Sequence, residues 1–142
     1  MINFVQSAVV TGTRIIDLMQ AARLEKPNFR HSFLVRCQDR LLPVTTEEVM
    51  ASYIDNGIVY LLLQGGKQYP VDMNLDDLQQ QLDPGQFFRA NRQFIVSRKA
   101  IHDMAVHFNG RLLLNLKVNT PEAIFISKER VSAFKRWFEA FN

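Results

Sequence analysis

The segment 87–97, with the sequence FFRANRQFIVS, concentrates side chains that could recognise another molecule. The guanidinium groups of Arg89 and Arg92 suit phosphate or a guanine edge, and the amides of Asn91 and Gln93 suit adenine. Aromatic and aliphatic residues bracket this polar group, whereas a buried strand would alternate or stay apolar. The pattern predicts a polar turn held at both ends by core residues, and such a turn alone is more often a solvated loop than a binding site.

The charges of the chain are unevenly distributed, although the net charge is only +3. Residues 37–85 contain two basic and eight acidic residues, a net charge of −6. Residues 86–136 contain ten basic and three acidic residues, a net charge of +7. This asymmetry favours a polyanionic partner for the second half of the chain. Folding that brings the two halves together would cancel the field, and the sequence leaves this alternative open.

The composition predicts one globular domain and no membrane segment. The 142 residues are 47% hydrophobic and include 11 Phe, which is ample material for a compact core. No run approaches the roughly 20 apolar residues needed to cross a bilayer, and the first residues lack the features of a signal peptide. The single Cys37 cannot form an internal disulfide. We expect a cytoplasmic protein.

Residues for catalysis or metal binding do not occur in any recognisable arrangement. With one Cys and three His, no zinc site is available, and no HExxH, GxSxG or Walker pattern is present. The acidic pairs Glu47-Glu48 and Asp76-Asp77 are interpreted as residues at helix starts. We therefore expect no enzyme activity, no cofactor and no metal.

The elements that must position segment 87–97 are predicted to be short antiparallel strands, so the fold class is mainly β with short helices. The turns at 56–57 and 109–110 both read Asn-Gly, the strongest short signal for a hairpin. Asn74 is expected to cap a short helix over 75–82, and 98–100 forms a single helical turn. Strands are expected at 33–35, 41–44, 49–54, 58–63, 67–73, 101–108, 112–118 and 124–126.

Both ends of the chain are predicted to carry an amphipathic helix. Ser127 is expected to cap the C-terminal helix, in which an apolar stripe faces the core and basic residues lie off the stripe. The stripe consists of Val131, Phe134, Phe138 and Phe141.

The N-terminal segment 1–30 is interpreted as a linker helix that lies outside the domain at 31–142. Residues 2–24 carry an apolar stripe and precede Pro27. We expect this stripe to associate with another copy, giving a homodimer, or with a neighbouring domain. Docking on its own domain is the alternative.

Five stretches of the sequence, together with the order of the elements, resemble the LytTR-type DNA-binding domain from about Phe33 to Phe141. The most specific feature is the LDP that ends a helix, followed by FFR, an Asn, two polar residues and an apolar IV pair. The stretches are FLVRCQDRLLPV, YIDNG, GKQYPVDMNLDDLQQQLDPGQFFRANRQFIVS, FNGRLLL and ISKERVSAFKRWF.

The resemblance implies a LytTR-like antiparallel β fold that reads DNA with loops between strands instead of with a recognition helix. It implies contacts from a hairpin turn, from the polar turn within segment 87–97 and from the start of the last helix. The residues at these places are Asn56; Asn91 and Arg92; and Ser127, Lys128 and Arg130. Arg89 is added as a candidate DNA contact because its guanidinium suits phosphate or a guanine edge. The hairpin turn ranks lowest because Asp55 beside it does not suit a phosphate contact. Many relatives have His at the position of Asn91 and Asn at that of Ser97, so their base preference does not transfer.

The resemblance further implies that the chain is the output module of a transcriptional regulator in a bacterial two-component system. Its partners would be duplex DNA with direct repeats in a promoter, an upstream receiver domain and, through a phosphorelay, a sensor kinase. No receiver domain with its phosphoacceptor Asp lies within these residues. One alternative is a protein-interaction module that binds an acidic partner through the basic half and the apolar N-terminal helix. RNA binding would require exposed aromatic rings as stacking platforms, whereas most Phe residues are predicted to lie in strands or in the apolar stripe.

Overall fold

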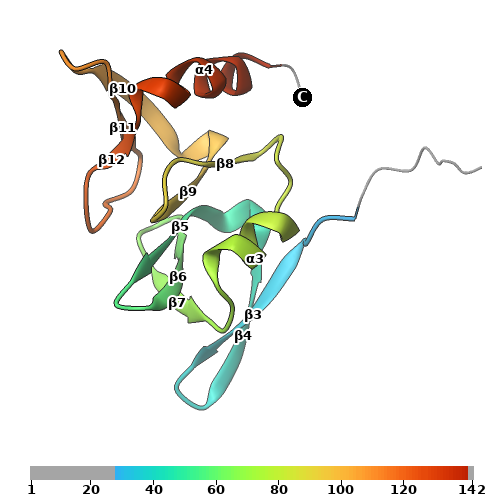
Figure 1. Cartoon of the computed structure of the whole chain (residues 1–142). Coiled ribbons are helices and arrows are strands. Elements are labelled where there is room, and N and C mark those ends of the chain that lie inside the picture. Colours follow the sequence, from blue (N-terminus) through green and yellow to red (C-terminus); the bar gives the residue numbers. More distant parts are fainter. Residues whose placement is uncertain (1–27, 141–142) are drawn as a thin grey trace, which may run out of the picture.

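The computed structural model describes residues 28–140, which form three antiparallel β-sheets with short helices between and beside them (Figure 1). The first half contains β3 (Ser32–Cys37), β4 (Arg40–Thr45), η1 (Thr46–Glu48), β5 (Val49–Asp55), β6 (Ile58–Leu63), β7 (Gln68–Val71) and α3 (Leu75–Gln81). The second half contains β8 (Phe87–Arg89), β9 (Phe94–Ser97), η2 (Arg98–Ala100), β10 (Ile101–Val106), β11 (Leu112–Leu116), β12 (Ile124–Ile126), η3 (Lys128–Arg130) and α4 (Val131–Glu139). The predicted class, mainly β with antiparallel pairing, is confirmed.

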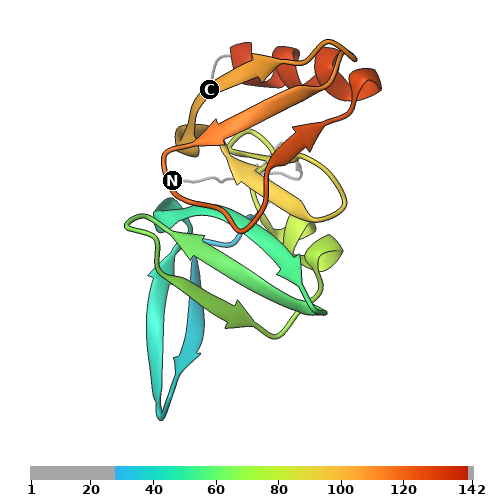
Figure 2. The same ribbon diagram turned by 90° about the vertical axis from the view of Figure 1, so that its left-hand side faces the viewer.

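A five-stranded sheet with the order β7-β6-β5-β9-β8 forms the middle of the molecule. The hairpin β3–β4 lies at one end, and the three-stranded sheet β10-β11-β12 lies with α4 at the other (Figures 1 and 2). The middle sheet is packed on both faces, so its strands β5 and β9 are almost continuously apolar and buried. A strand that is buried on both faces loses the simple alternation of a surface strand.

The alternation of side chains along a strand divides the middle sheet between two hydrophobic cores. On β9, Phe94 and Val96 face the first core, whereas Ile95 between them faces the second. Successive side chains of a strand point to opposite faces, so a three-residue apolar run fills both cores at once. The last residues of segment 87–97 thus anchor the polar turn from both sides of the sheet.

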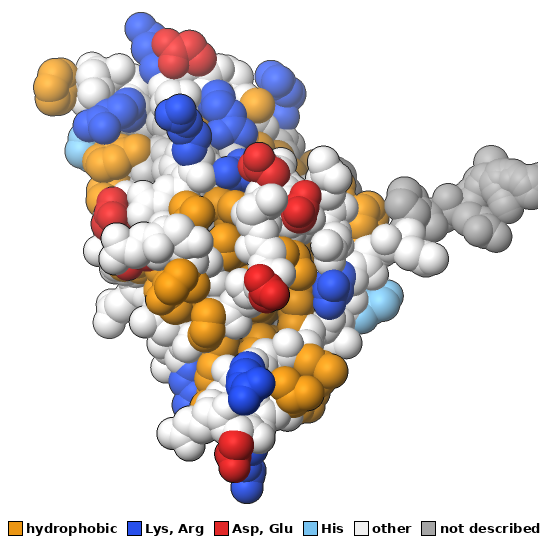
Figure 3. Space-filling view, turned by 60° about the horizontal axis from the view of Figure 1, so that its bottom comes forward, with side chains coloured by type: hydrophobic (Ala, Val, Ile, Leu, Met, Phe, Trp, Pro, Cys, Tyr) orange, Lys and Arg blue, Asp and Glu red, His pale blue; other side chains and the backbone are white. Residues whose placement is uncertain are grey.

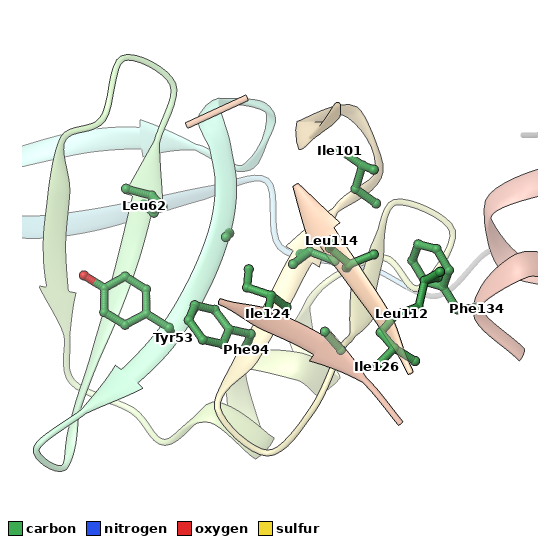
Figure 4. Close-up of a cluster of buried hydrophobic side chains, with 12 residues drawn as sticks. Tyr53, Leu62, Phe94, Ile101, Leu112, Leu114, Ile124, Ile126 and Phe134 are labelled. Atoms are coloured by element: carbon green, nitrogen blue, oxygen red, sulfur yellow. The ribbon is translucent and has the colours of Figure 1, made fainter. Parts of the chain in front are cut away.

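The first core joins the middle sheet to β10–β12 and α4 (Figure 4). Phe134 of α4 is fully buried there, and its ring lies 5.3 Å, edge to face, from that of Phe88. The second core joins the opposite face to the hairpin β3–β4 and α3. Its buried members include Phe33, Leu61 and Leu78.

Two expectations about the C-terminal helix are corrected by the structure. Ser127 occupies the N-cap position of η3, but its side chain makes no capping hydrogen bond. Trp137, which lies outside the predicted apolar stripe, packs against both Phe134 and Phe88 with ring distances of 5.7 Å and 5.1 Å. Phe138 of the stripe is 36% exposed instead of facing the core. The fourth member of the stripe, at position 141, lies outside the described residues.

Most turns and caps follow their sequence signals, but several strands are shorter than predicted. Asn74 accepts a hydrogen bond from the Asp77 amide at 2.7 Å, as expected for an N-cap. Strand β10 ends at Val106, so Phe108 lies in the following turn and not in a strand. The predicted helix at 2–24 lies outside the described residues. Within residues 28–140, no helix is long and apolar enough to cross a membrane.

Candidate nucleic-acid interface

Three segments that are distant in sequence meet at one end of the middle sheet. The turn 55–57 joins β5 to β6, and the turn 90–93 joins β8 to β9. Backbone hydrogen bonding continues from β5 to the second turn, because the Ile54 amide donates to the Gln93 carbonyl at 3.1 Å. The second turn also contacts β12, which leads directly into η3. We call the segments 55–57, 90–93 and 125–130 together the turn cluster.

Asn91 ties the central turn of the turn cluster to itself and to β12. Its side-chain oxygen accepts hydrogen bonds from the amides of Gln93 at 2.8 Å and Phe94 at 3.0 Å. Its side-chain NH2 group donates to the Phe125 carbonyl at 3.0 Å. An Asn side chain commonly closes a turn in this way. All these amide contacts are internal, so the side chain holds the turn in shape.

Arg89 is also engaged inside the protein. Its Nε donates to the Asn91 carbonyl at 2.7 Å, and an NH2 group donates to the Arg92 carbonyl at 2.8 Å. Its remaining terminal nitrogen contacts Asp76 at 2.9 Å and Gln79 at 2.8 Å, both on α3. The side chain is only 17% exposed. Arg89 therefore braces the turn against α3, and its predicted role as a DNA contact stays a prediction.

Arg92 differs from its neighbours because its side chain is exposed at the tip of the turn and makes no hydrogen bond or ion pair within residues 28–140. Ser127 and Lys128 are exposed as well, at the start of η3. Arg130 is half-buried; its guanidinium lies 5.0 Å from the Phe88 ring centre and donates to the Ala90 carbonyl at 2.9 Å. The predicted residues thus divide into braces and free side chains.

Arg111 is a basic residue of this region that the sequence reasoning missed. Its guanidinium lies 4.0 Å from the ring centre of Phe125, a stacking geometry that holds the charge in place. Its Nε is buried and has no hydrogen-bond partner within the described residues. The sequence does indicate that Arg111 lies near the surface, because it directly follows the Asn109-Gly110 turn of a hairpin. Hairpin neighbours alone, however, do not reveal that β11 lies beside β12 and the turn 90–93.

An open groove of about 670 Å³ connects these side chains. It lies between the turn 90–93, the start of β11 and the β12–η3 junction. The side chains that line it are mostly basic or amide-bearing: Asp76, Arg89, Ala90, Asn91, Arg92, Arg111, Phe125, Ser127 and Arg130. Its one acidic residue, Asp76, is paired with Arg89, so the groove presents positive charge.

The surface around the turn cluster favours an anion. In the space-filling view, Lys and Arg side chains gather in the upper part of one face, whereas its centre carries apolar side chains together with Asp and Glu (Figure 3). Glu122 also lies close to the turn cluster, and it accepts a hydrogen bond from Gln93 at 3.2 Å. Of the nearby acids, Asp76 is paired with Arg89, whereas Arg92 and Lys128 stay unpaired within the described residues.

Asn56 lies at the same end of the sheet but in a different chemical setting. It has a φ of 51° and precedes Gly57 with a φ of 77°, the geometry that an Asn-Gly hairpin turn requires. The residues on either side of the turn, Asp55 and Ile58, are exposed, and Asp55 adds a negative charge. Burial, and to a lesser extent the nearby Tyr60 and the charge of Asp55, raise the pKa of Tyr53 above its usual value of 10.0. Asn56 thus lies at the less basic edge of the turn cluster.

The family model of the LytTr DNA-binding domain matches residues 39–139. The chain belongs to the LytTR family. The matched range contains all three segments of the turn cluster, and the resemblance inferred from the sequence is confirmed. The roles of individual side chains are not decided by this match and stay predictions.

A solved LytTr domain has the same fold. It is the LytTr DNA-binding domain of a protein described as a methyl-accepting/DNA response regulator from Bacillus cereus. The TM-score is 0.66 at 19% sequence identity, and the alignment covers 78% of this chain and 99% of that chain. At this identity the likeness establishes the LytTR fold alone. A comparison with curated protein sequences returned no significant match.

Proposed function

We propose that this LytTR domain binds duplex DNA in a sequence-specific manner and serves as the output module of a transcriptional regulator. The observation that carries the proposal is the convergence of three turns at one end of the sheet, where exposed or groove-lining basic residues without an ion pair among the described residues meet. These residues are Arg92, Arg111, Lys128 and Arg130. Family membership supports DNA as the polyanion.

Under this proposal, the domain reads DNA with its turns and not with a recognition helix. The apolar side of α4 packs in the first core through Phe134, and Arg130 at its start donates to a turn carbonyl. Base reading is therefore assigned to the turns, whose side chains can enter a groove while backbone hydrogen bonds hold them rigid. A rigid support for contacting side chains lowers the entropy that binding costs.

The two free basic side chains are proposed to have different roles. Arg92, at the tip of the turn braced by Asn91 and Arg89, reads a base edge, since a guanidinium fits the acceptors of guanine in the major groove. Lys128 contacts phosphate, because an ammonium on a flexible stem provides charge without base selectivity. Arg92→Ala is expected to cost about 1–3 kcal/mol and to relax the preference at one base pair. Lys128→Ala is expected to weaken all sequences alike.

The experiment measures the affinity of both variants for a duplex selected from a random pool and for each of its single-base variants. Lys67→Ala is the matched control, because Lys67 is exposed in the β6–β7 turn at the opposite end of the sheet. The control should bind like the wild type. Equal losses for Arg92→Ala on matched and mismatched sites would refute the assignment of base reading to Arg92.

The setting of the domain in a two-component system is part of the same proposal. It is supported by the description of the similar solved domain as part of a response regulator. Under this proposal, a receiver domain precedes the LytTR domain, a sensor kinase phosphorylates it, and two copies bind the direct repeats of a promoter. The N-terminal residues 1–30 then act as the linker. A reporter gene controlled by the selected site should respond to the full regulator and lose its response with Arg92→Ala.

A further inference from the structure

The turn between β10 and β11 displays an aromatic ring that no core uses. Phe108 is fully exposed at 103%, and Val106 before it is 76% exposed. Exposed apolar residues are common singly, so exposure alone carries no conclusion. The exposure of Phe108 indicates a contact surface because the turn that carries the ring is held by hydrogen bonds and lies beside the basic groove.

Hydrogen bonds fix the shape of this turn. The Gly110 amide donates to the His107 carbonyl at 2.8 Å, and the His107 amide donates to the Arg111 carbonyl at 2.9 Å. The Arg111 amide donates to the Asn109 side-chain oxygen at 3.2 Å. Gly110 has a φ of 85°, which the tight turn requires. The ring of Phe108 is thus carried by a defined hairpin tip.

Contacts on both sides place this tip against the turn cluster. The His107 ring lies 5.2 Å, edge to face, from that of Phe125, the same ring on which Arg111 stacks. On the other side, a Cβ added at Gly110 would lie only 3.0 Å from the Lys128 side chain, so the lysine stem runs along the turn. The hairpin tip projects beside the start of the C-terminal helix in both ribbon views (Figures 1 and 2). Two cations, Arg111 and Lys128, therefore flank the residue that bears the exposed ring.

We propose that Phe108 is a DNA-contacting residue that buries its ring in a groove of the duplex against the edges of the bases. This inference rests on the proposed function. Phosphates of the duplex bound by Arg111 and Lys128 would place the DNA groove that lies between these phosphates over the hairpin tip. Apolar side chains contact the thymine methyl or wedge against base steps in known DNA complexes. The ring supplies affinity through removal of apolar surface from water, a contribution that does not depend on salt.

The test compares Phe108→Ala and Phe108→Leu with the wild type on the selected duplex over a range of salt concentrations. Leu41→Ala is the control, since Leu41 is 62% exposed on the β3–β4 hairpin, at the other end of the molecule. Phe108→Ala should lose roughly tenfold in affinity with the salt slope of the wild type. Phe108→Leu should keep most of the affinity, and Leu41→Ala should keep all of it.

Three results would overturn the inference. Phe108→Ala could bind like the wild type. Its salt slope could instead become shallower, as expected for the loss of a phosphate contact, which would make the turn a support for phosphate contacts. It could also keep its affinity for one site and lose only cooperativity on two adjacent sites, which would assign the ring to a second copy of the chain. If the wild type itself binds no duplex above background, the proposed function fails first, and the two failures are thereby distinguished.

Discussion

Asn91→Ala should unfold the centre of the turn cluster and not merely remove a polar group from its surface. The side chain makes three hydrogen bonds, two as acceptor from the Gln93 and Phe94 amides and one as donor to the Phe125 carbonyl. Alanine has no side-chain amide, so all three backbone groups lose their hydrogen-bond partner. Phe94 is fully buried, so water cannot readily replace the contact to its amide.

The magnitude follows from the number of bonds lost. A hydrogen bond in a protein contributes a net 0.5–1.5 kcal/mol, so three give a loss of about 2–4 kcal/mol in the free energy of unfolding. For a domain of this size the melting temperature should fall by an amount on the order of 10 °C. Asn91→Asp keeps the two acceptor contacts and loses only the donor to Phe125, so its loss should be smaller.

Arg92→Ala is the matched control, since its side chain is exposed and has no partner within residues 28–140. Its free energy of unfolding should stay within about 0.5 kcal/mol of the wild type. Urea unfolding and thermal melting measure stability, and DNA affinity is measured below the transition. A wild-type melting temperature for Asn91→Ala would refute the bracing role, and so would equal destabilisation by the two substitutions.

Further predictions concern the supports of the fold. Arg98→Ala should lower the free energy of unfolding by about 1.5–3 kcal/mol, and Arg98→Lys should not restore it. The guanidinium donates to the Trp137 and Phe138 carbonyls at the end of α4 and stacks 4.3 Å from the Trp137 ring, which a lysine cannot reproduce. Chemical denaturation measures the stability of both variants. Gly110→Ala should destabilise by about 1–3 kcal/mol, since it combines a φ of 85° with a contact to Lys128; a melting temperature like that of the wild type would contradict this. Burial keeps Tyr53 neutral, so its stabilising contribution is complete below pH 10.0 and is lost as the pH rises through the raised pKa; urea unfolding at alkaline pH should show this decline in the wild type and not in Tyr53→Phe. A chain starting at Asn28 should melt close to the full chain but self-associate less in sedimentation, because both cores lie within the described residues.

Much of the fold could be predicted because its signals are local. The two Asn-Gly turns depend on positive φ at Asn56, Gly57 and Gly110, and the Asn74 cap depends on a side-chain oxygen. These elements and the 3₁₀ turn at 98–100 occur where expected. The ends of strands were less predictable. Strand β10 stops at Val106 because its pairing with β11 ends there, and the pairing depends on a partner that hydrophobic pattern alone does not identify.

The candidate site was predictable in location but not in the use of each side chain. Segment 87–97 reveals a donor-rich turn, yet Arg89, Asn91 and Arg92 have the same apparent chemistry in the sequence. Their difference depends on α3 and β12, whose residues Asp76 and Phe125 lie 13 and 34 positions from their partners. Arg111 was missed for the same reason. Trp137 was missed because helical periodicity placed it beside the apolar stripe. Its packing depends on the ring of Phe88, which lies on β8 and is not identified by the helical pattern.

The central claim, that the turn cluster binds duplex DNA, is tested most directly by affinity measured against salt. The wild type is titrated with its selected duplex, with a scrambled duplex and with the separated single strands between about 50 and 200 mM salt. Arg89 is paired with Asp76 and Arg92 is assigned to a base, so Arg111, Lys128 and Arg130 are left to contact phosphates. Three phosphate contacts predict a slope of about −3 in a plot of log affinity against log salt. The selected duplex should bind more tightly than the other two at every concentration. A flat plot, or equal affinity for selected and scrambled duplex, would contradict the account.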